Sequence, residues 1–323
     1  MEFPLELKNA IDIKASAWKP SDLRKTSAAI TARYKNESGK GKKLIISELD
    51  AVVYSAVRMP ATFAAVSQAL YYALEGSGID RKEIHTLLDV GAGTGTAAWA
   101  ADTVLELDEI VCLERERAMS ALGAEYMQSG SEALKRAEWI SSDLTADNFL
   151  YTADLVTASY VLNELTEENR IKALKKLWNT AKKMLIIIEP GTPEGFRQMK
   201  AARDLLIGEG AYLAAPCPHE NQCRLAENDW CHFTVRVQRG KLHKMIKDAD
   251  VPYEDEKFIY MAFVHTKPER KGARILRHPN TQKGRVTLEI CTESENKIET
   301  ITKTKKEFYK AAKKSQCGDL LYY

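Results

Sequence analysis

A glycine-rich turn between a short apolar strand and a helix constrains this chain more than any other feature. The run LLDVGAGTGTAAWA contains Gly91, Gly93 and Gly95. Glycines at such a turn leave the backbone open to a cofactor, because a side chain would block close approach. Carboxylates follow at later strand ends, with Glu114 closing IVCLE and Asp143 following WISS. The pattern therefore predicts a nucleotide-binding site at the carboxyl ends of parallel strands.

Predicted strands and helices alternate from residue 84 onward. The segments IHTLLDV, EIVCLERE, AEWISSDL, ADLVTASYVL and KKMLIIIEPG predict strands, and the segments between them predict helices. This alternation predicts an α/β fold with a parallel sheet covered on both faces. We expect a helical region over residues 1–80, a core over 81–212, and an α+β part over 213–323. Some strands of the last part are expected to complete the core sheet.

The cysteines are concentrated in one polar loop. Cys217, Cys223 and Cys231 lie close together in a 323-residue chain that has six cysteines. Free cysteine prefers burial, whereas this loop is rich in Asn, Gln, Glu and Asp. Thiolates are good ligands for zinc and for iron–sulfur clusters, and a four-coordinate centre needs one more ligand. The best candidate for it is Cys291, at the end of VTLEIC, and the alternatives are His219 and His232.

The spacing of these cysteines excludes two thiolate patterns. It does not match the C-x2-C pairs of a zinc ribbon, and it does not match the C-x3-C-x2-C of radical S-adenosylmethionine enzymes. From residue types alone, zinc and an iron–sulfur cluster remain equally open. Cys112 lies among apolar residues and is expected to be a core thiol, and Cys317 is expected to be unligated.

Composition and charge limit the class of protein. Hydrophobic residues make up 45% and charged residues 28% of the chain, which is ordinary for a soluble globular protein. No apolar stretch approaches ~18 residues, so no membrane span is expected. The N-terminal run MEFPLELKNAIDIK lacks the features of a signal peptide. We therefore expect a cytoplasmic, bacterial-type protein that is monomeric when free.

The charge is unevenly distributed along the chain. The net charge is +4 over residues 1–58, −10 over residues 59–232 and +8 over residues 233–323. A basic C-terminal third beside an acidic middle suggests contact with a polyanion such as RNA. The alternative is a set of solvated lysine faces that bind nothing.

The glycine turn and the carboxylates after it resemble those of class I S-adenosylmethionine-dependent methyltransferases, whose sheet is Rossmann-like. The resemblance implies that Asp89 and the glycines approach the methionine part, Glu114 the ribose and Asp143 the adenine amino group. The main alternative is an NAD-binding fold. The residues expected around the cofactor are Asp89, Gly91, Ala92, Gly93, Gly95, Glu114 and Asp143.

The segment SYVLNEL, after the fourth strand, bears on the reaction. Amino-methylating nucleic-acid enzymes usually carry an Asn/Asp-Pro-Pro-aromatic tetrad there, but Asn163 is not followed by prolines. No Pro-Cys pair follows the fourth or fifth strand, so covalent attack on a pyrimidine has no obvious nucleophile. Asn163 and Glu164 are weak candidates for the acceptor pocket, or else they begin the next helix. Glu189 is a third candidate, or else it caps the helix after Pro193.

Several motifs in order resemble the methyltransferase-like proteins of the mitochondrial small ribosomal subunit and their bacterial relatives. The resemblance runs from about residue 20 to residue 319, through RMPATFAAV, the glycine turn, SYVLNEL, EPGTPEGF, the cysteine loop, YEDEKF, RILRHP and LEICT. It implies that Cys217, Cys223, Cys231 and Cys291 hold a [4Fe–4S] cluster. One departure is Cys317, where relatives tend to carry a tryptophan.

The resemblance also implies a function. We expect an S-adenosylmethionine-dependent methyltransferase-like protein that acts on the RNA of the small ribosomal subunit during assembly. The alternative is a non-catalytic assembly factor that retains S-adenosylmethionine and the cluster as structural elements.

Overall fold

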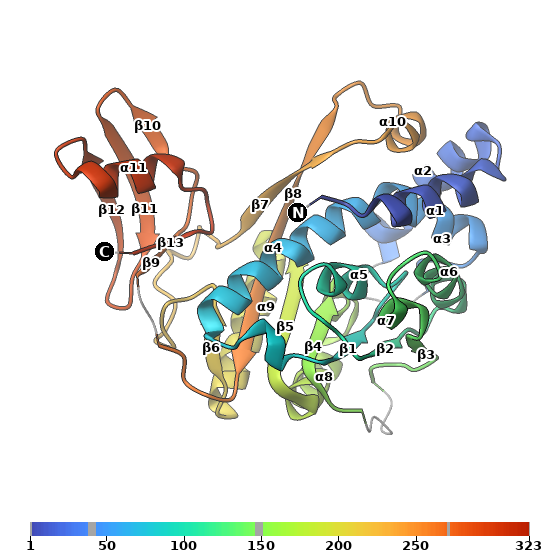
Figure 1. Cartoon of the computed structure of the whole chain (residues 1–323), viewed down its shortest axis with the longest axis horizontal. Coiled ribbons are helices and arrows are strands. Elements are labelled where there is room, and N and C mark those ends of the chain that lie inside the picture. The colour runs from blue at the N-terminus through green and yellow to red at the C-terminus, as the bar shows by residue number, and fades with distance from the viewer. Residues whose placement is uncertain (1, 38–42, 146–150, 270–271, 323) are drawn as a thin grey trace.

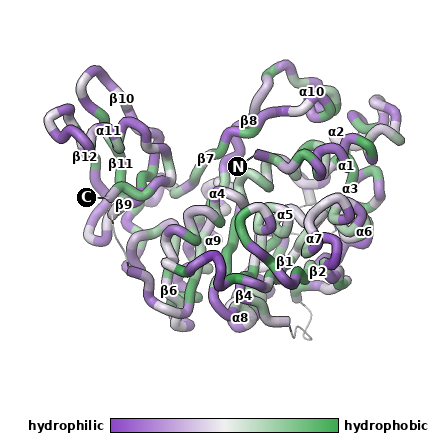
Figure 2. The backbone as a smooth tube through the Cα atoms, viewed as in Figure 1, coloured by the Kyte–Doolittle hydropathy of each residue, from purple (hydrophilic) through white to green (hydrophobic). Residues whose placement is uncertain are grey.

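A mixed sheet between two layers of helices forms the body of the protein, and a second, smaller sheet lies at its C-terminal end (Figure 1). The computed structural model describes residues 2–37, 43–145, 151–269 and 272–322. Hydropathy follows this division, because apolar residues run along the central strands whereas the outer loops of the small sheet are mainly hydrophilic (Figure 2).

The core sheet has the order β3-β2-β1-β4-β5-β8-β6, with β7 paired to β8. Strands β1 to β5 are parallel, and β8 runs antiparallel to β5, β6 and β7. The strand order reverses between β1 and β4, and in such sheets the ligand site lies outside the carboxyl ends at this reversal. The strands are β1 (Thr86–Val90), β2 (Glu109–Leu113), β3 (Glu138–Ile140), β4 (Ala153–Ser159), β5 (Ala181–Pro190), β6 (Tyr212–Ala215), β7 (Phe233–Gln238) and β8 (Tyr253–Val264).

Successive strand residues alternate between the two helical layers, as expected for a sheet buried on both faces. Leu87 and Leu155 pack against one layer, and Leu88 and Val156 pack against the other. The first layer contains α5 (Thr96–Asp102), α6 (Arg117–Met127) and α7 (Glu132–Lys135), together with the N-terminal helices. The second contains α8 (Glu167–Thr180) and α9 (Pro193–Gly208). Shorter elements are η1 (Arg81–Glu83), η2 (Leu162–Glu164) and α10 (Lys241–Lys247).

Four helices precede the core sheet, namely α1 (Leu5–Ser16), α2 (Pro20–Glu37), α3 (Glu48–Val57) and α4 (Met59–Ser77). Helix α4 begins with a proline in its first turn and is followed by Gly78 in the left-handed conformation, the usual start and stop signals. Most of α4 is buried against β6, β7 and β8. Arg33 of α2 forms two 2.9 Å ion-pair contacts with Asp50 of α3, which fixes the two helices to each other.

The apolar character of α3 and α4 reflects burial inside the protein. Within the described residues, no single helix is long and apolar enough to cross a membrane. The pair α3 and α4, bent by 55°, meets the length and composition requirement together, and both helices are largely buried against the rest of the chain.

The C-terminal sheet has the order β10-β11-β9-β13, and β12 pairs antiparallel with β11. Its apolar core is small, since only eight buried residues form it. The sequence did not predict β12, because its segment is polar: Ile301 is buried whereas Ile298 is 73% exposed. The elements are β9 (Ala273–Ile275), β10 (Asn280–Gln282), β11 (Arg285–Cys291), β12 (Asn296–Thr302), α11 (Lys306–Lys314) and β13 (Leu320–Leu321).

Candidate functional site

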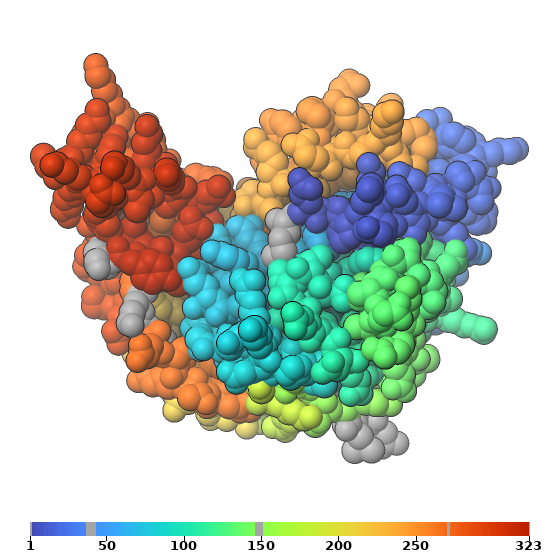
Figure 3. Space-filling view, viewed as in Figure 1, coloured from blue at the N-terminus to red at the C-terminus, as the bar shows by residue number. Residues whose placement is uncertain are grey.

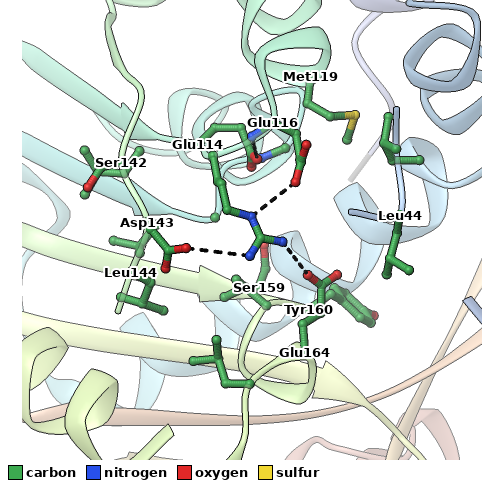
Figure 4. Close-up of a pocket in the computed structure, with 18 of the residues that line it drawn as sticks. Leu44, Glu114, Glu116, Met119, Ser142, Asp143, Leu144, Ser159, Tyr160 and Glu164 are labelled. Carbon is green, nitrogen blue, oxygen red and sulfur yellow. Dashed lines mark hydrogen bonds and ion pairs between the residues drawn. The ribbon is translucent and has the colours of Figure 1, made fainter. Parts of the chain in front are cut away.

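The glycine turn lines a pocket at the carboxyl ends of β1, β2 and β4 (Figure 4). Gly91 and Gly93 have φ angles of 67° and 58°, a region that other residues rarely adopt. A Cβ atom on Gly91 would lie 2.5 Å from Cγ2 of Val161, so a side chain there cannot fit without displacing the segment after β4. The turn therefore needs glycine both for its conformation and for its packing.

Glu114 connects the end of β2 to the glycine turn. Its Oε2 accepts a hydrogen bond from the backbone N–H of Gly93 at 2.8 Å, and its Oε1 accepts one from that of Glu116 at 2.7 Å. Burial raises the pKa of Glu114, and these two hydrogen bonds oppose the increase. The carboxylate lines the pocket.

Arg115 also lines this pocket, and the sequence did not predict it. Its guanidinium lies 3.1 Å from Oε1 of Glu116, 3.7 Å from Oδ2 of Asp143 and 4.0 Å from Oε2 of Glu164 (Figure 4). These carboxylates come from three different parts of the fold. One cation therefore lies among three of the four carboxylates that line the pocket. The only sequence signal for it was a basic residue directly after a strand-end carboxylate.

Asp143 lies on the pocket wall after β3. Its Oδ1 accepts hydrogen bonds from the N–H and the hydroxyl of Thr145, at 2.9 and 2.7 Å. Partial burial works against ionisation, but these bonds and the charge of Arg115 lower the pKa of Asp143 below its ordinary value. Asp143 is thus a fixed, charged acceptor facing the pocket.

Three residues predicted to bind the cofactor are not among those that line the pocket, namely Asp89, Ala92 and Gly95. Asp89 is fully buried and accepts a hydrogen bond from the hydroxyl of Thr157 at 2.8 Å. Burial raises the pKa of Asp89 to about 7. Gly95 precedes α5, and a Cβ there would lie 2.4 Å from Cε of Met127. Sequence spacing alone cannot distinguish residues with such structural contacts from residues that contact a ligand.

The three weak candidates for the acceptor pocket, Asn163, Glu164 and Glu189, lie in different places. Glu164 lines the same pocket as Glu114 and Asp143, and burial raises its pKa to about 7. Asn163 lines a second, adjoining cavity. Glu189 is buried and accepts the backbone N–H of Leu162 at 2.9 Å, so it holds η2 in place. It does not cap the helix after Pro193, because the Thr192 side chain caps α9.

The four predicted metal ligands, Cys217, Cys223, Cys231 and Cys291, line one cavity between the two sheets. The first two lie in the loop after β6, the third lies just before β7, and Cys291 ends β11. Burial raises the pKa of Cys231 well above its ordinary value and that of Cys291 to about 12. Among the described residues, no three Cys, His, Asp or Glu side chains form a group that could hold a metal ion.

Two buried arginines line the same cavity and were not predicted. Arg203 and Arg274 are each 2% exposed. Arg203 donates to the carbonyls of His219 and Asn221, at 3.1 and 2.7 Å. Arg274 donates to the carbonyls of Pro216 and Gly318, both at 2.7 Å. Burial raises the pKa of Cys217, and the neighbouring charge of Arg203 opposes the increase.

The other cysteines and the two histidines considered as ligands lie at different places from the four cavity cysteines. Cys112 is fully buried in the core, which confirms that prediction. Cys317 is buried with its sulfur 3.2 Å from the carbonyl of Leu276. His219 lies beside the cavity thiols, with Nε2 3.6 Å from Sγ of Cys291, whereas the ring of His232 stacks on Trp230 with centroids 5.4 Å apart.

The sheet order, with an antiparallel strand inserted between β5 and β6, and the glycine turn facing acidic strand ends define a Rossmann-like methyltransferase fold. The chain belongs to the family described as mitochondrial small ribosomal subunit Rsm22, which matches residues 48–322. This bears out the family resemblance read from the motifs.

Curated relatives carry related descriptions. The ribosome assembly protein METTL17, mitochondrial, of Homo sapiens is 26% identical over 302 residues, covering 87% of this chain and 64% of the human protein. The Rsm22-cox11 tandem protein 2, mitochondrial, of Schizosaccharomyces pombe is 22% identical over 359 residues, covering 93% of this chain and 47% of that protein. The chain thus spans only part of the length of these relatives.

Solved methyltransferase structures are similar in fold. The magnesium protoporphyrin IX methyltransferase of Synechocystis with bound S-adenosylmethionine is 12% identical, with a TM-score of 0.42, and the match covers 73% of this chain and 96% of that one. The plantazolicin methyltransferase BpumL is 11% identical, with a TM-score of 0.44 and coverage of 76% and 98%.

The expected cytoplasmic, bacterial-type location is wrong. The matched family and the relatives above are described as mitochondrial. The composition and the N-terminal residues on which that expectation depended carry no information about a family's compartment.

Proposed function

We propose that this chain is an S-adenosylmethionine-dependent methyltransferase-like protein that acts on the RNA of the small ribosomal subunit during its assembly. Family membership supports the ribosomal part, because a curated relative is described as a ribosome assembly protein. The observation that carries the methyltransferase part is the pocket at the strand reversal, where the glycine turn faces Glu114 and Asp143.

The pocket residues fit S-adenosylmethionine by their chemistry. The backbone at Gly91 and Gly93 leaves space for the methionine part, the carboxylate of Glu114 suits ribose hydroxyls, and the carboxylate of Asp143 suits an adenine amino group. When bound, this cofactor supplies a methyl group on a sulfonium that is already a good leaving group. The task of the chain is then to position the acceptor and exclude water. An adenine amine at Asp143 competes with Arg115 for the same carboxylate.

Glu164 is the pocket residue best suited to take a proton from an acceptor. Its carboxyl lines the cofactor pocket, and its pKa of about 7 lies near neutral pH, where a general base is most effective. The bound cofactor would supply the methyl group that the acceptor takes up. A proton released from the acceptor passes to the Glu164 carboxylate.

We propose that the four cavity cysteines hold a [4Fe–4S] cluster, with zinc as the alternative. Both centres carry negative charge when bound by four thiolates, and buried charge needs a buried counter-charge. Arg203 and Arg274 supply it from inside the protein, next to the thiols. Because three of these cysteines lie between β6 and β7 of the core sheet and the fourth ends β11 of the small sheet, the centre would also fix the small sheet to the core.

The identity of the metal is tested by purification without oxygen, followed by iron, sulfide and zinc analysis and an absorption spectrum. We expect about four iron and four sulfide per chain, from the composition of such a cluster. A Cys223→Ser variant should lose most of both, and Cys317→Ser is the matched control that should retain them. Iron-free protein with stoichiometric zinc would select the alternative, and full iron content in Cys223→Ser would contradict the ligand set.

RNA contact is proposed for the C-terminal sheet. Lys303, Lys306, Lys313 and Lys314 are exposed, and none has a carboxylate within 4.0 Å among the residues described. Unpaired surface lysines bind phosphates by releasing counterions. Figure 3 shows this sheet and the β7–β8 hairpin as two projections separated by a notch, so a nucleic acid strand has a surface on which to lie.

Transfer of labelled methyl groups to immature small subunits tests the proposed activity. Wild-type protein should transfer label, and Gly93→Asp should not, because a carboxymethyl group at φ 58° fills the turn. Calorimetry should show the matching loss of S-adenosylmethionine binding, with Gly208→Asp, in open space on α9, as the control. Subunit binding without any transfer would favour the non-catalytic assembly factor.

A further inference from the structure

A second cavity adjoins the cofactor pocket beneath the N-terminal helices. Its volume is about 410 Å³, within the range of pockets that bind small molecules. Helices α2, α3 and α10 contribute to its wall, together with the segment after β4. Tyr34, Tyr54 and Tyr160 line both this cavity and the cofactor pocket. A group bound in the second cavity would therefore lie beside the cofactor.

Aromatic rings stand at the junction of the two cavities. The rings of Tyr34 and Tyr54 are 6.4 Å apart between centroids, with their planes inclined by only 23°. Base–aromatic stacking contributes ~1–3 kcal/mol per base and tolerates any sequence. These rings therefore suit a flat heterocycle.

The third ring is held by a partly buried network of Tyr160, Arg58 and Glu256. Tyr160 has a φ of 57°, which is uncommon for a bulky residue. Its hydroxyl donates to Oε1 of Glu256 at 2.9 Å, and Arg58 donates to both oxygens of the same carboxylate at 3.0 and 3.1 Å. Strained backbone of this kind persists only where the surroundings fix it, and it is typical of ligand sites. The network links α3 to β8 and fixes the Tyr160 ring at the junction.

Polar and cationic groups complete the cavity. The side-chain amide of Asn163 offers both a donor and an acceptor to a base edge. Lys247 lines the cavity from α10 and has no carboxylate within 4.0 Å among the residues described. A cation at the wall of an aromatic cavity suits the phosphate attached to a base.

We propose that this cavity receives one unpaired base of an RNA strand and presents it to the cofactor pocket. The inference rests on the proposed function and names the form in which its RNA substrate binds. The base stacks against Tyr34 and Tyr54, Asn163 contacts its edge, and Lys247 contacts the adjoining phosphate. An unpaired base is required because the atoms of a stacked, paired base are inaccessible to a pocket of this depth.

The test uses the full chain and a single-stranded RNA oligonucleotide containing one 2-aminopurine, whose fluorescence is quenched by stacking. Tyr54→Leu should weaken binding between about 5-fold and about 150-fold, the equivalent of one lost stacking contact. Tyr71→Leu, an exposed tyrosine on α4 outside both cavities, is the matched control and should leave binding unchanged. Free 2-aminopurine riboside is the second probe and should bind more weakly than the oligonucleotide.

A filling variant separates the two cavities. Thr31 lines only the second cavity, so Thr31→Trp should abolish quenching while calorimetric binding of S-adenosylhomocysteine is unchanged. The proposal is overturned if folded Thr31→Trp and Tyr54→Leu proteins quench like wild type, or if the riboside binds as tightly as the oligonucleotide. Wild-type protein that binds S-adenosylhomocysteine without quenching also overturns it but leaves the proposed function intact. Quenching without cofactor binding supports the cavity and overturns the methyltransferase assignment.

Discussion

The buried carboxyl of Glu189 gives a prediction whose size follows from the structure. Its side chain is 2% exposed, Oε1 accepts the N–H of Leu162, and Oε2 has no hydrogen-bond partner among the described residues. Burial raises its pKa from 4.5 to about 8. The carboxyl is therefore protonated in the folded protein at neutral pH, whereas it is ionised in the unfolded chain.

This difference makes stability fall as the pH rises. Between pH 4.5 and 8 the folded state binds a proton that the unfolded state has released, so the free energy of unfolding decreases with pH. Each pH unit above the pKa of the unfolded chain lowers the free energy of unfolding by about 1.36 kcal/mol. The loss is therefore about 3 kcal/mol at pH 7 and about 1 kcal/mol at pH 5. Glu189→Gln removes this cost, because its amide oxygen still accepts from Leu162 and no proton must be taken up.

The measurement is urea unfolding of wild type and Glu189→Gln at pH 5 and pH 7, followed by tryptophan fluorescence. The free energy of unfolding of the variant minus that of wild type should be about 2 kcal/mol larger at pH 7 than at pH 5. Any pH-independent cost of the new amide cancels in this comparison. Glu106→Gln, at an exposed position, is the control and should show no such pH dependence. A difference that is the same at both pH values would refute the reasoning.

Three further predictions concern other contacts. Asp50→Asn should lower the free energy of unfolding by about 3 kcal/mol in urea titrations, because it leaves the partly buried guanidinium of Arg33 without its ion pair; a loss below about 1 kcal/mol would contradict this. Cys291→Ser should speed amide hydrogen exchange in β9 to β13 but not in β1 to β5, since the proposed metal centre would join the sheets through the cavity that Cys291 lines; equal protection in both proteins would count against it. Replacing Lys306 and Lys313 by alanine should reduce the slope of log affinity for single-stranded RNA against log salt by about 1.4, and an unchanged slope would exclude α11 from the contact.

The residues that could be predicted from sequence are those whose roles are local. The glycine turn, the strand-end carboxylates Glu114 and Asp143, and the alternating strands follow from short patterns, and the structure has them in one pocket. Arg115 could not be predicted, because its three carboxylate partners come from separate elements.

The burial of two arginines could not be predicted from the sequence either. The burial of Arg203 and Arg274 depends on backbone carbonyls supplied by other segments of the chain, which their own sequence neighbours do not indicate. Asp89 is in the glycine-turn motif but does not line the pocket, and it accepts a hydrogen bond from Thr157 of the neighbouring strand. Short motifs therefore predict a pocket at the right edge of the sheet, but tertiary packing determines which motif residues face it.

The position of β8 in the core sheet has a consequence for the newborn polypeptide. Strand β5 ends at Pro190, and its antiparallel neighbour β8 is complete only at Val264. While residues 191–264 are being synthesised, the apolar strand β5 has an open edge, and such edges pair readily with other chains. A product released before Val264 should therefore aggregate instead of folding as a smaller unit, and translation of this stretch is the period in which a holding chaperone matters most.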